Sequence, residues 1–489
     1  MSDDATVAVQ GGQAEGRPPL SLKTRALRGV AWTLAGDGAS QVIRLISTTV
    51  LTRLLHPETF GLMVIITVVQ QGLSMFSDIG VQPAIVQHKR GDDQTFLDTA
   101  WTLQAVRGTA LWTASLLLAW PVSLYGHEPA LLYLLPAVGL NSLVDGFLST
   151  KIFTCDRHLS VGRLTLLNTG TAVLGLVVRI VWAMVSPTVW SLVAGGLATT
   201  IARVLLSHWV LAGPVNRFCW DRGSVRELVH FGRWVFVSTI LTFVATQLDK
   251  LVFVRLVPLR LLGIYNIGQT MSRLPSETVV RIGASVMFPA FSRLRDRQAD
   301  LGSAYARIRA PLLVGGGTAL SALTLGGPLV AQILFPARYH DAGWIMQIVA
   351  VGMWFQALES TNGSVLLASG LPKWLAIGNL LKIALMAVVL PLSYSQWGFA
   401  GALVGMSFVE LPKYFVEALR VRKLGLEGWR IEFGLTAAVL LCATVAFGLH
   451  VWSPPGGAVY LKLCIAAACG ALVWIPLLFW ASRTAKLRS

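Results

Sequence analysis

The stretch QLDKLVFVRLVPLRLLGIYNIGQTMSRLPSETVVR, residues 247–281, decides the fold class of this chain. Two apolar segments are joined there by a short turn at residues 258–260, and both segments carry charges. The charged residues are Asp249, Lys250, Arg273, Glu277 and Arg281. The last three recur at every fourth position, so on a helix they share one face. Because a charge inside a bilayer is costly unless it faces a partner or a water-filled cavity, the stretch predicts a functional polar face within a membrane-spanning hairpin.

The composition of the whole chain is that of a polytopic membrane protein. Of its 489 residues, 54% are hydrophobic and only 13% are charged, and the mean hydropathy is +0.64. These values exclude an array of soluble domains. A formal net charge of +16 would suggest a nucleic-acid partner for a soluble protein. Membrane topology explains the basic residues here, so no nucleic-acid partner is expected.

Motifs for metals, cofactors and nucleotide hydrolysis are missing from the sequence. The five cysteines show no CxxC spacing, the eight histidines include no HExxH pair, and no GxxxxGK[ST] loop occurs. Residues 338–341 are the nearest approach to a ligand cluster, and they read as a plain loop because a metal site needs three or four ligands. We therefore expect no cofactor, no metal and no enzymatic activity.

Apolar runs of about 20 residues between turn signals predict an all-α protein with fourteen transmembrane helices. Residues 1–28 are predicted to form a disordered cytoplasmic tail, because they lack the apolar region of a signal peptide. The predicted spans are 29–52, 60–83, 101–124, 129–150, 161–184, 188–212, 229–256, 261–288, 310–334, 343–367, 374–394, 397–418, 431–452 and 458–481. Two loops, 214–228 and 293–309, are expected to form short amphipathic surface helices.

The distribution of Lys and Arg predicts the orientation of these spans. Most basic residues fall in the tail and in every second loop, where Arg309 and Lys413 are counted among them. The alternate loops carry only Arg53, Arg255, Arg260, Arg338 and Lys462. By the positive-inside rule both termini are cytoplasmic, which requires an even number of spans.

An internal repeat organises the chain into two halves. A shift of 202 positions brings Gly61 onto Gly263 and Gln71 onto Arg273 without gaps. Further matches at this shift are Trp32 with Trp234, Val50 with Val252, Arg53-Leu54 with Arg255-Leu256, Ile65 with Ile267, and Ser74 with Ser276. Six spans separate the copies, so the prediction is two parallel six-helix lobes related by an axis along the membrane normal. The predicted parts are a lobe at 29–212, a cytoplasmic linker at 213–228, a lobe at 229–420, and spans 13 and 14 with a basic cytoplasmic tail at 421–489.

Polar residues of the first lobe also lie on single helix faces. Asp37, Gln41 and Arg44, with Thr48, follow helical spacing in the first span, as do Gln71, Ser74 and Asp78 in the second. In transporters with such repeats the substrate path lies between the lobes, so we expect these faces to line the inter-lobe cleft. Arg273 and Arg281 would contribute from the second lobe, although a column neutralised by Glu277 along its own helix would give the same spacing.

The sequence resembles the bacterial polysaccharide exporters, the Wzx-type lipid-linked oligosaccharide flippases of the MOP superfamily. The first signature is Arg53-Leu54-Leu55 with Pro57, Phe60-Gly61-Leu62, Asp78, Gly80 and Gln87. The second is Gln247, Asp249-Lys250, Gly263, Tyr265-Asn266, Pro275 and the run from Phe288 to Leu294. Among subgroups it looks most like the colanic-acid and succinoglycan-type exporters.

The resemblance implies a flippase of the bacterial inner membrane that moves undecaprenyl-diphosphate-linked oligosaccharide repeat units by alternating access through a cationic cavity, in exopolysaccharide or O-antigen-type biosynthesis. Arginine suits a diphosphate because its planar fork donates two hydrogen bonds at once. The predicted substrate contacts are Arg44, Arg273, Arg281, Lys250, Gln41 and Gln71. The carboxylates expected to pair with these cations or to carry H⁺ or Na⁺ are Asp37, Asp78, Asp249, Glu277 and Glu359. The implied partners are the lipid-linked oligosaccharide, membrane lipids, and a polymerase with export machinery.

Other assignments stay open. A lipid II flippase of the same superfamily would share the cationic cavity, whereas a cation-coupled drug antiporter would be dominated by carboxylates. The loop motif of major-facilitator carriers is missing from residues 82–94. A membrane glycan polymerase or ligase would need a large outer loop, and none is predicted. Arg179, Arg203 and Lys382 are expected to snorkel or pack between helices, and Glu359 and Glu410 are expected to be lone carboxylates.

Overall fold

The computed structural model describes residues 22–77, 80–158, 161–287, 291, 301–426, 428–452, 470 and 474. This part of the chain is helical and contains no strand. Its elements are α1 (Leu22–Leu54), α2 (Pro57–Phe76), α3 (Val81–Gln87), α4 (Gln94–Gly126), α5 (Leu131–Asp145), α6 (Lys151–Arg157), α7 (Val161–Val185), α8 (Trp190–Trp209), α9 (Arg222–Leu256), α10 (Leu259–Ile282), the π-helical turn η1 (Gly283–Met287), α12 (Leu301–Leu334), the 3₁₀ turn η2 (Ala337–Tyr339), α13 (Ala342–Ala368), α14 (Lys373–Lys423) and α15 (Trp429–Trp452). Asp78 and most of the expected span 458–481 lie outside the described residues.

Helices occupy the first thirteen expected span positions. The eleventh and twelfth are joined in α14, which is broken at Gly398. The backbone there has φ 64° and ψ −156°, a region that side chains other than glycine rarely enter, so this glycine supplies the turn between two antiparallel helices. By length and apolar composition alone, six helices of the described part qualify as membrane spans, which makes the chain a multi-pass membrane protein.

The prediction of a surface helix at residues 214–228 is wrong for the first half of this segment. Residues 214–221 are irregular, and α9 begins at Arg222 and runs without interruption to Leu256. Asp221 ends the irregular stretch because its carboxylate accepts hydrogen bonds from the backbone N–H (2.8 Å) and hydroxyl (2.7 Å) of Ser224, which satisfies the first turn of α9. The described part of the second expected surface helix, residues 301–309, belongs to α12.

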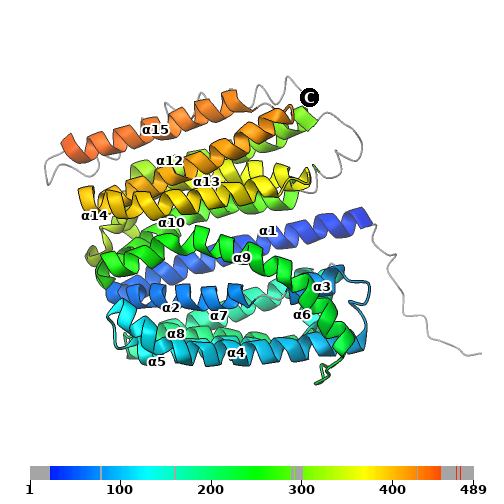
Figure 1. Cartoon of the computed structure of the whole chain (residues 1–489). Helices are drawn as coiled ribbons and strands as arrows, with labels where there is room; N and C mark the ends of the chain where they lie inside the picture. Colours follow the sequence, from blue (N-terminus) through cyan, green and yellow to red (C-terminus); the bar gives the residue numbers. More distant parts are fainter. Residues whose placement is uncertain are drawn as a thin grey trace, which may run out of the picture.

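The helices group into two sets, α1 to α8 and α9 to α15, and α1, α2, α9 and α10 lie where the two sets meet (Figure 1). In the first set α1 packs on α7, α7 on α8, and α4 on α5. In the second set α13 packs between α12 and α14, and also against α10. The sets meet where α2 packs on α9 and α10, and their buried side chains form one continuous core that includes Phe60, Tyr265 and Trp354. The helices with the polar faces therefore lie at the junction of the two sets.

A reciprocal glycine contact joins α2 to α10 at this junction. A Cβ on Gly61 would overlap the backbone carbonyl of Leu259, and a Cβ on Gly263 would overlap the backbone carbonyl of Pro57. Both pairs obey the repeat, because 57 + 202 = 259 and 61 + 202 = 263. Each copy thus presents the same surface to the other, which is how an isologous two-fold contact is built.

The 3₁₀ turn η2 fastens the end of α1. Arg338 donates to the backbone carbonyls of Thr52 (2.9 Å) and Arg53 (2.7 Å), and the Tyr339 hydroxyl donates to the carbonyl of Leu55 (3.0 Å). The last carbonyls of a helix lack partners within the helix, so these bonds stabilise the α1 terminus.

The described residues contain no cluster of three metal-ligand side chains.

Candidate functional site

A ladder of polar pairs connects α1 to α10. Arg44 forms an ion pair with Glu277 at 3.0 Å, the Gln41 amide donates to the Thr278 hydroxyl at 3.1 Å, and Asp37 forms an ion pair with Arg281. The idea that Glu277 neutralises a column along its own helix is wrong, because its partner lies on α1. The two helices run antiparallel, so the expected polar face of α1 and the charged face of α10 meet rung by rung.

The ion pairs of the ladder are only partly buried. The Arg44 and Arg281 side chains are 36% and 43% exposed, against 28% for Glu277 and 25% for Asp37. An ion pair that faces a water-filled cleft contributes little to stability, since water screens it. The ladder can therefore open at low cost, and each opening exposes an arginine.

A second polar connection lies in the middle of the junction. The Gln247 amide donates to the Gln71 amide oxygen at 3.0 Å, and the buried Lys250 ammonium donates to the Gln247 oxygen at 3.2 Å. Lys250 is thus connected by hydrogen bonds to Gln71 of the first lobe through the Gln247 side chain. The alternative that it snorkels to the outer surface is wrong, because its side chain is turned into the protein and is almost fully buried.

Asp249 lies within the second set of helices. Its carboxylate is buried and accepts hydrogen bonds from the Tyr265 hydroxyl at 2.5 Å and the Gln269 amide at 3.0 Å, both on α10. It therefore fastens α9 to α10. Asp249 shares the lining of a cavity of about 40 Å³ with Arg273, a volume that holds only a few water molecules. Lys382 and Glu410 are the other charged residues that line this cavity. Arg273 forms no ion pair within the described part of the chain.

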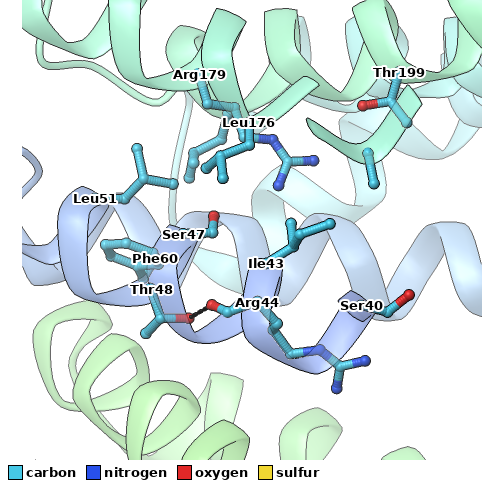
Figure 2. A pocket seen from close by; sticks show the side chains of 12 residues that line it. Ser40, Ile43, Arg44, Ser47, Thr48, Leu51, Phe60, Leu176, Arg179 and Thr199 are labelled. Atoms are coloured by element: carbon cyan, nitrogen blue, oxygen red, sulfur yellow. Dashed lines mark hydrogen bonds between the residues drawn. The ribbon is translucent and has the colours of Figure 1, made fainter. Parts of the chain in front are cut away.

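A larger cavity of about 310 Å³ lies between α1, α7 and α8, and it contains two arginines (Figure 2). Arg179 on α7 directs its guanidinium into the space between these helices, while Arg44 points to the opposite side of α1. The Nε atom of Arg179 is buried, with no hydrogen-bond partner among the described residues. The stem of its side chain crosses α8 at Gly195, where a Cβ would overlap it. Of the two expectations for Arg179, packing between helices is therefore confirmed and snorkelling is wrong.

Four ionisable residues expected to be alone or in loops form buried pairs. Glu359 on α13 is 2.6 Å from Lys413 on α14, and Glu410 pairs with Lys382. Neither glutamate is a lone carboxylate, and Lys413 is not a loop residue. Arg309, also counted as a loop charge, is buried in α12 and paired with Glu432. Single-residue hydropathy missed these pairs because each partner comes from a different helix or, for Lys382 and Glu410, from the other half of α14.

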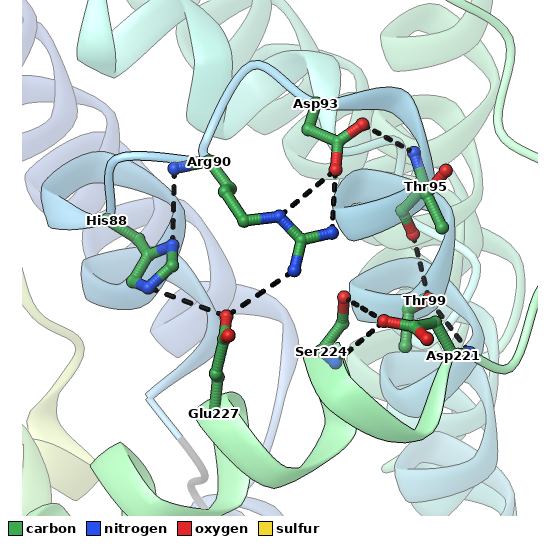
Figure 3. A network of polar contacts seen from close by, with 8 residues as sticks. All are labelled: His88, Arg90, Asp93, Thr95, Thr99, Asp221, Ser224 and Glu227. Carbon is green, nitrogen blue, oxygen red and sulfur yellow. Dashed lines mark hydrogen bonds and ion pairs between the residues drawn. The ribbon is translucent and has the colours of Figure 1, made fainter.

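A polar network fastens the loop between α3 and α4 to the start of α9 (Figure 3). Arg90 pairs with Asp93 at 2.8 Å and lies 3.8 Å from Glu227, which is also 3.5 Å from His88. Asp93 caps α4 by accepting from the backbone N–H of Thr95. The hydrogen bond from Arg90 lowers the pKa of Asp93, and the bonds from Ser224 lower that of Asp221. The network holds the two sets of helices together beyond the ends of their spans.

Comparison with known proteins places this geometry in a known class. The lipid II flippase MurJ in its inward closed conformation superposes with a TM-score of 0.70 at 11% identity, covering 93% of this chain and 99% of MurJ. An inward-facing multidrug resistance MATE family transporter of the MOP superfamily gives 0.63 at 12% identity, covering 78% and 94%. This chain therefore shares its fold with both proteins.

The sequence comparisons are more specific. The chain belongs to the polysaccharide biosynthesis protein family, whose profile matches residues 50–314, more than half of its length. The lipopolysaccharide biosynthesis protein WzxC of Escherichia coli K12 is 21% identical over 395 residues, which make up 80% of each chain. These findings confirm the resemblance to polysaccharide exporters.

Proposed function

We propose that this protein is a flippase that carries a polyprenyl-diphosphate-linked oligosaccharide from the cytoplasmic to the outer leaflet of the bacterial inner membrane. The observation that carries the proposal is the α1–α10 ladder, in which Arg44 and Arg281 are held by carboxylates of the opposite helix that a diphosphate can replace. A diphosphate accepts paired hydrogen bonds from guanidinium groups, and its charge exceeds that of a single carboxylate. Family membership and the MurJ-like fold support the same assignment.

In this proposal each charged group has a separate task. Arg44 and Arg281 bind the diphosphate as the ladder opens, while Asp37 and Glu277 hold them when no substrate is present. Arg179 and Arg273 line the two cavities and form no ion pair with another described residue, so they offer further cationic contacts. Gln41, Gln71 and Lys250 lie along the junction, where hydroxyl-rich sugars need hydrogen-bond partners.

The membrane arrangement belongs to the proposal. We place fourteen spans across the inner membrane with both termini in the cytoplasm, and two six-helix lobes that rock about the Gly61–Gly263 contact to give alternating access. A drug antiporter is the second candidate. The small cavity lined by Asp249 and Glu410 supports a drug antiporter, because such a carrier needs carboxylates. Arginines line this cavity and also the larger cavity between α1, α7 and α8, and they favour an anionic substrate.

The experiment is a gene deletion in a strain without a redundant exporter, with the lipid-linked repeat unit probed on each membrane face. We expect the repeat unit to accumulate on the cytoplasmic face and polymer production to stop. Wild-type protein should restore export, and Arg273→Ala should insert normally yet fail to restore it. Arg226→Ala, which changes an exposed arginine near the start of α9, is the matched control. Normal polymer production in the deletion strain would contradict the proposal.

A further inference from the structure

Glu417 on α14 is a fully buried carboxyl group that no donor from the described residues reaches. Its exposed fraction is 0%, and neither carboxyl oxygen has a hydrogen-bond partner in the described part of the chain. The carboxyl lies between helices α13 and α14, where two glycines leave room for it. A Cβ on Gly378 would lie 3.4 Å from one oxygen, and a Cβ on Gly363 would lie 3.7 Å from the other. The site is therefore enclosed on both sides by backbone.

The charged groups that face Glu417 are already paired with one another. Glu359 on α13 binds Lys413, one turn before Glu417 on α14, at 2.6 Å. Glu410, a further turn away, is held by Lys382 from the first half of α14. Glu359, Lys413 and Glu410 are the charged groups that interact electrostatically with Glu417. Each pair is neutral, so an ionised Glu417 would leave one uncompensated negative charge inside the helix bundle.

Such a charge is unfavourable. An ionised carboxylate in a low-dielectric interior without donors costs several kcal/mol, and protonation removes that cost. A protonated Glu417 can in turn donate to the neighbouring Glu359 carboxylate. Two carboxyl groups that share one lysine then hold one proton between them, as closely placed acid pairs do.

We infer that Glu417, with Glu359 and Lys413, is a proton-binding site, and that its proton is released when the lobes rearrange. Release breaks the O–H bond of Glu417 and passes the proton to water, which leaves two carboxylates around the single Lys413 ammonium and a net charge of −1. Water that enters the site as the lobes rearrange solvates this remaining charge. Uptake reverses these steps. The coupling of this proton to transport rests on the proposed function, but the protonation of Glu417 does not.

Infrared spectroscopy of the full-length protein in lipid membranes tests the site directly. A protonated carboxyl group has a carbonyl stretching band that carboxylates lack. We expect this band at neutral pH in the wild type, its loss in Glu417→Gln, and its retention in Glu410→Gln. The glutamine is close in shape to the protonated acid, so the variant should fold. A band that is absent from the wild type, or unchanged in Glu417→Gln, would overturn the inference.

Transport in proteoliposomes tests the coupling. An imposed proton gradient should accelerate the flipping of a polyprenyl-diphosphate-linked glycan by the wild type, and Glu417→Gln should lose that acceleration while it still flips without a gradient. Equal acceleration of both proteins would overturn coupling through Glu417. If the wild type flips nothing, the proposed function fails, and the infrared result alone decides whether Glu417 holds a proton.

Discussion

Arg44 on α1 and Glu277 on α10 form an ion pair of 3.0 Å between residues 233 positions apart in the sequence. The pair joins the two halves of the chain at their junction, where we propose that the substrate passes. Because both side chains are about a third exposed, the pair is a contact that can open rather than a fixed structural bridge.

The two members of this pair should differ in their effect on export. We expect Arg44→Ala to abolish export, since it removes a substrate contact, and Glu277→Gln to retain part of it, since it removes only the resting partner. A double-mutant cycle on thermal unfolding should give a coupling energy of about 0.2–1 kcal/mol, typical of exposed pairs. Arg226→Ala again serves as the control. Wild-type export by Arg44→Ala would exclude a substrate role for this arginine.

The α1–α10 ladder should have to open in every transport cycle. A short reagent that reacts with two thiols and contains a reducible disulfide can link Gln41→Cys to Thr278→Cys, because the native side chains meet at 3.1 Å. This cross-link should block export in a background without other cysteines, and reduction should restore export. The matched control links Gln70→Cys on α2 to Ser115→Cys on α4, whose native side chains meet at 3.0 Å within the first set of helices, and should leave export unchanged. Export that continues through the cross-linked Gln41–Thr278 pair would show that the ladder stays closed during transport.

The Gly61–Gly263 contact should tolerate no side chain. We expect Gly263→Ala to destabilise the protein by about 1–3 kcal/mol, the usual cost of overpacking, because the new methyl group meets the rigid backbone carbonyl of Pro57. Thermal unfolding in detergent measures the effect. Gly170→Ala is the control, since nothing lies within 4 Å of its Cβ. Equal melting temperatures for the two variants would argue against close backbone contact.

Arg179 should depend on the glycine that its stem crosses. Gly195→Ala should displace the arginine and reduce export, as Arg179→Leu should. Gly196→Ala, whose Cβ would make only an ordinary contact with Asn141 at 3.8 Å, should export normally. Stable insertion of all three variants is checked by immunoblotting of membranes. If Arg179→Leu exports normally, the cavity between α1, α7 and α8 takes no part in transport.

The network of Figure 3 should weaken in acid. The pKa values of Asp93 and Asp221 are lowered in the folded state, so their stabilising effect is complete above the ordinary value of 3.8 and is lost as the pH falls below it. Hydrogen exchange of residues 88–93 and 214–221 should then increase. Asp221→Asn keeps an acceptor for the helix cap but does not titrate, so exchange around α9 should lose part of its acid sensitivity. An unchanged profile would contradict the role of Asp221.

The sequence by itself determined where the helices lie and which residues share a face. The hydropathy of about 20 consecutive residues is a local property, so the positions of α1, α2, α9 and α10 could be predicted. The spacing of three or four positions between polar residues is also local, so the polar faces of α1 and α10 could be predicted. The repeat also predicted that Gly61 and Gly263 are equivalent. Family membership followed from signatures within the same helices.

Only the tertiary structure decided which charges meet. Glu277 has an arginine one turn away on each side, yet it pairs with Arg44 across the junction. Glu359 and Lys413 looked like an isolated carboxylate and a loop cation until the packing of α13 on α14 joined them. The partner of a buried charge is set by whichever helix packs against it, often more than a hundred residues away, and spacing within one helix contains no information about that neighbour.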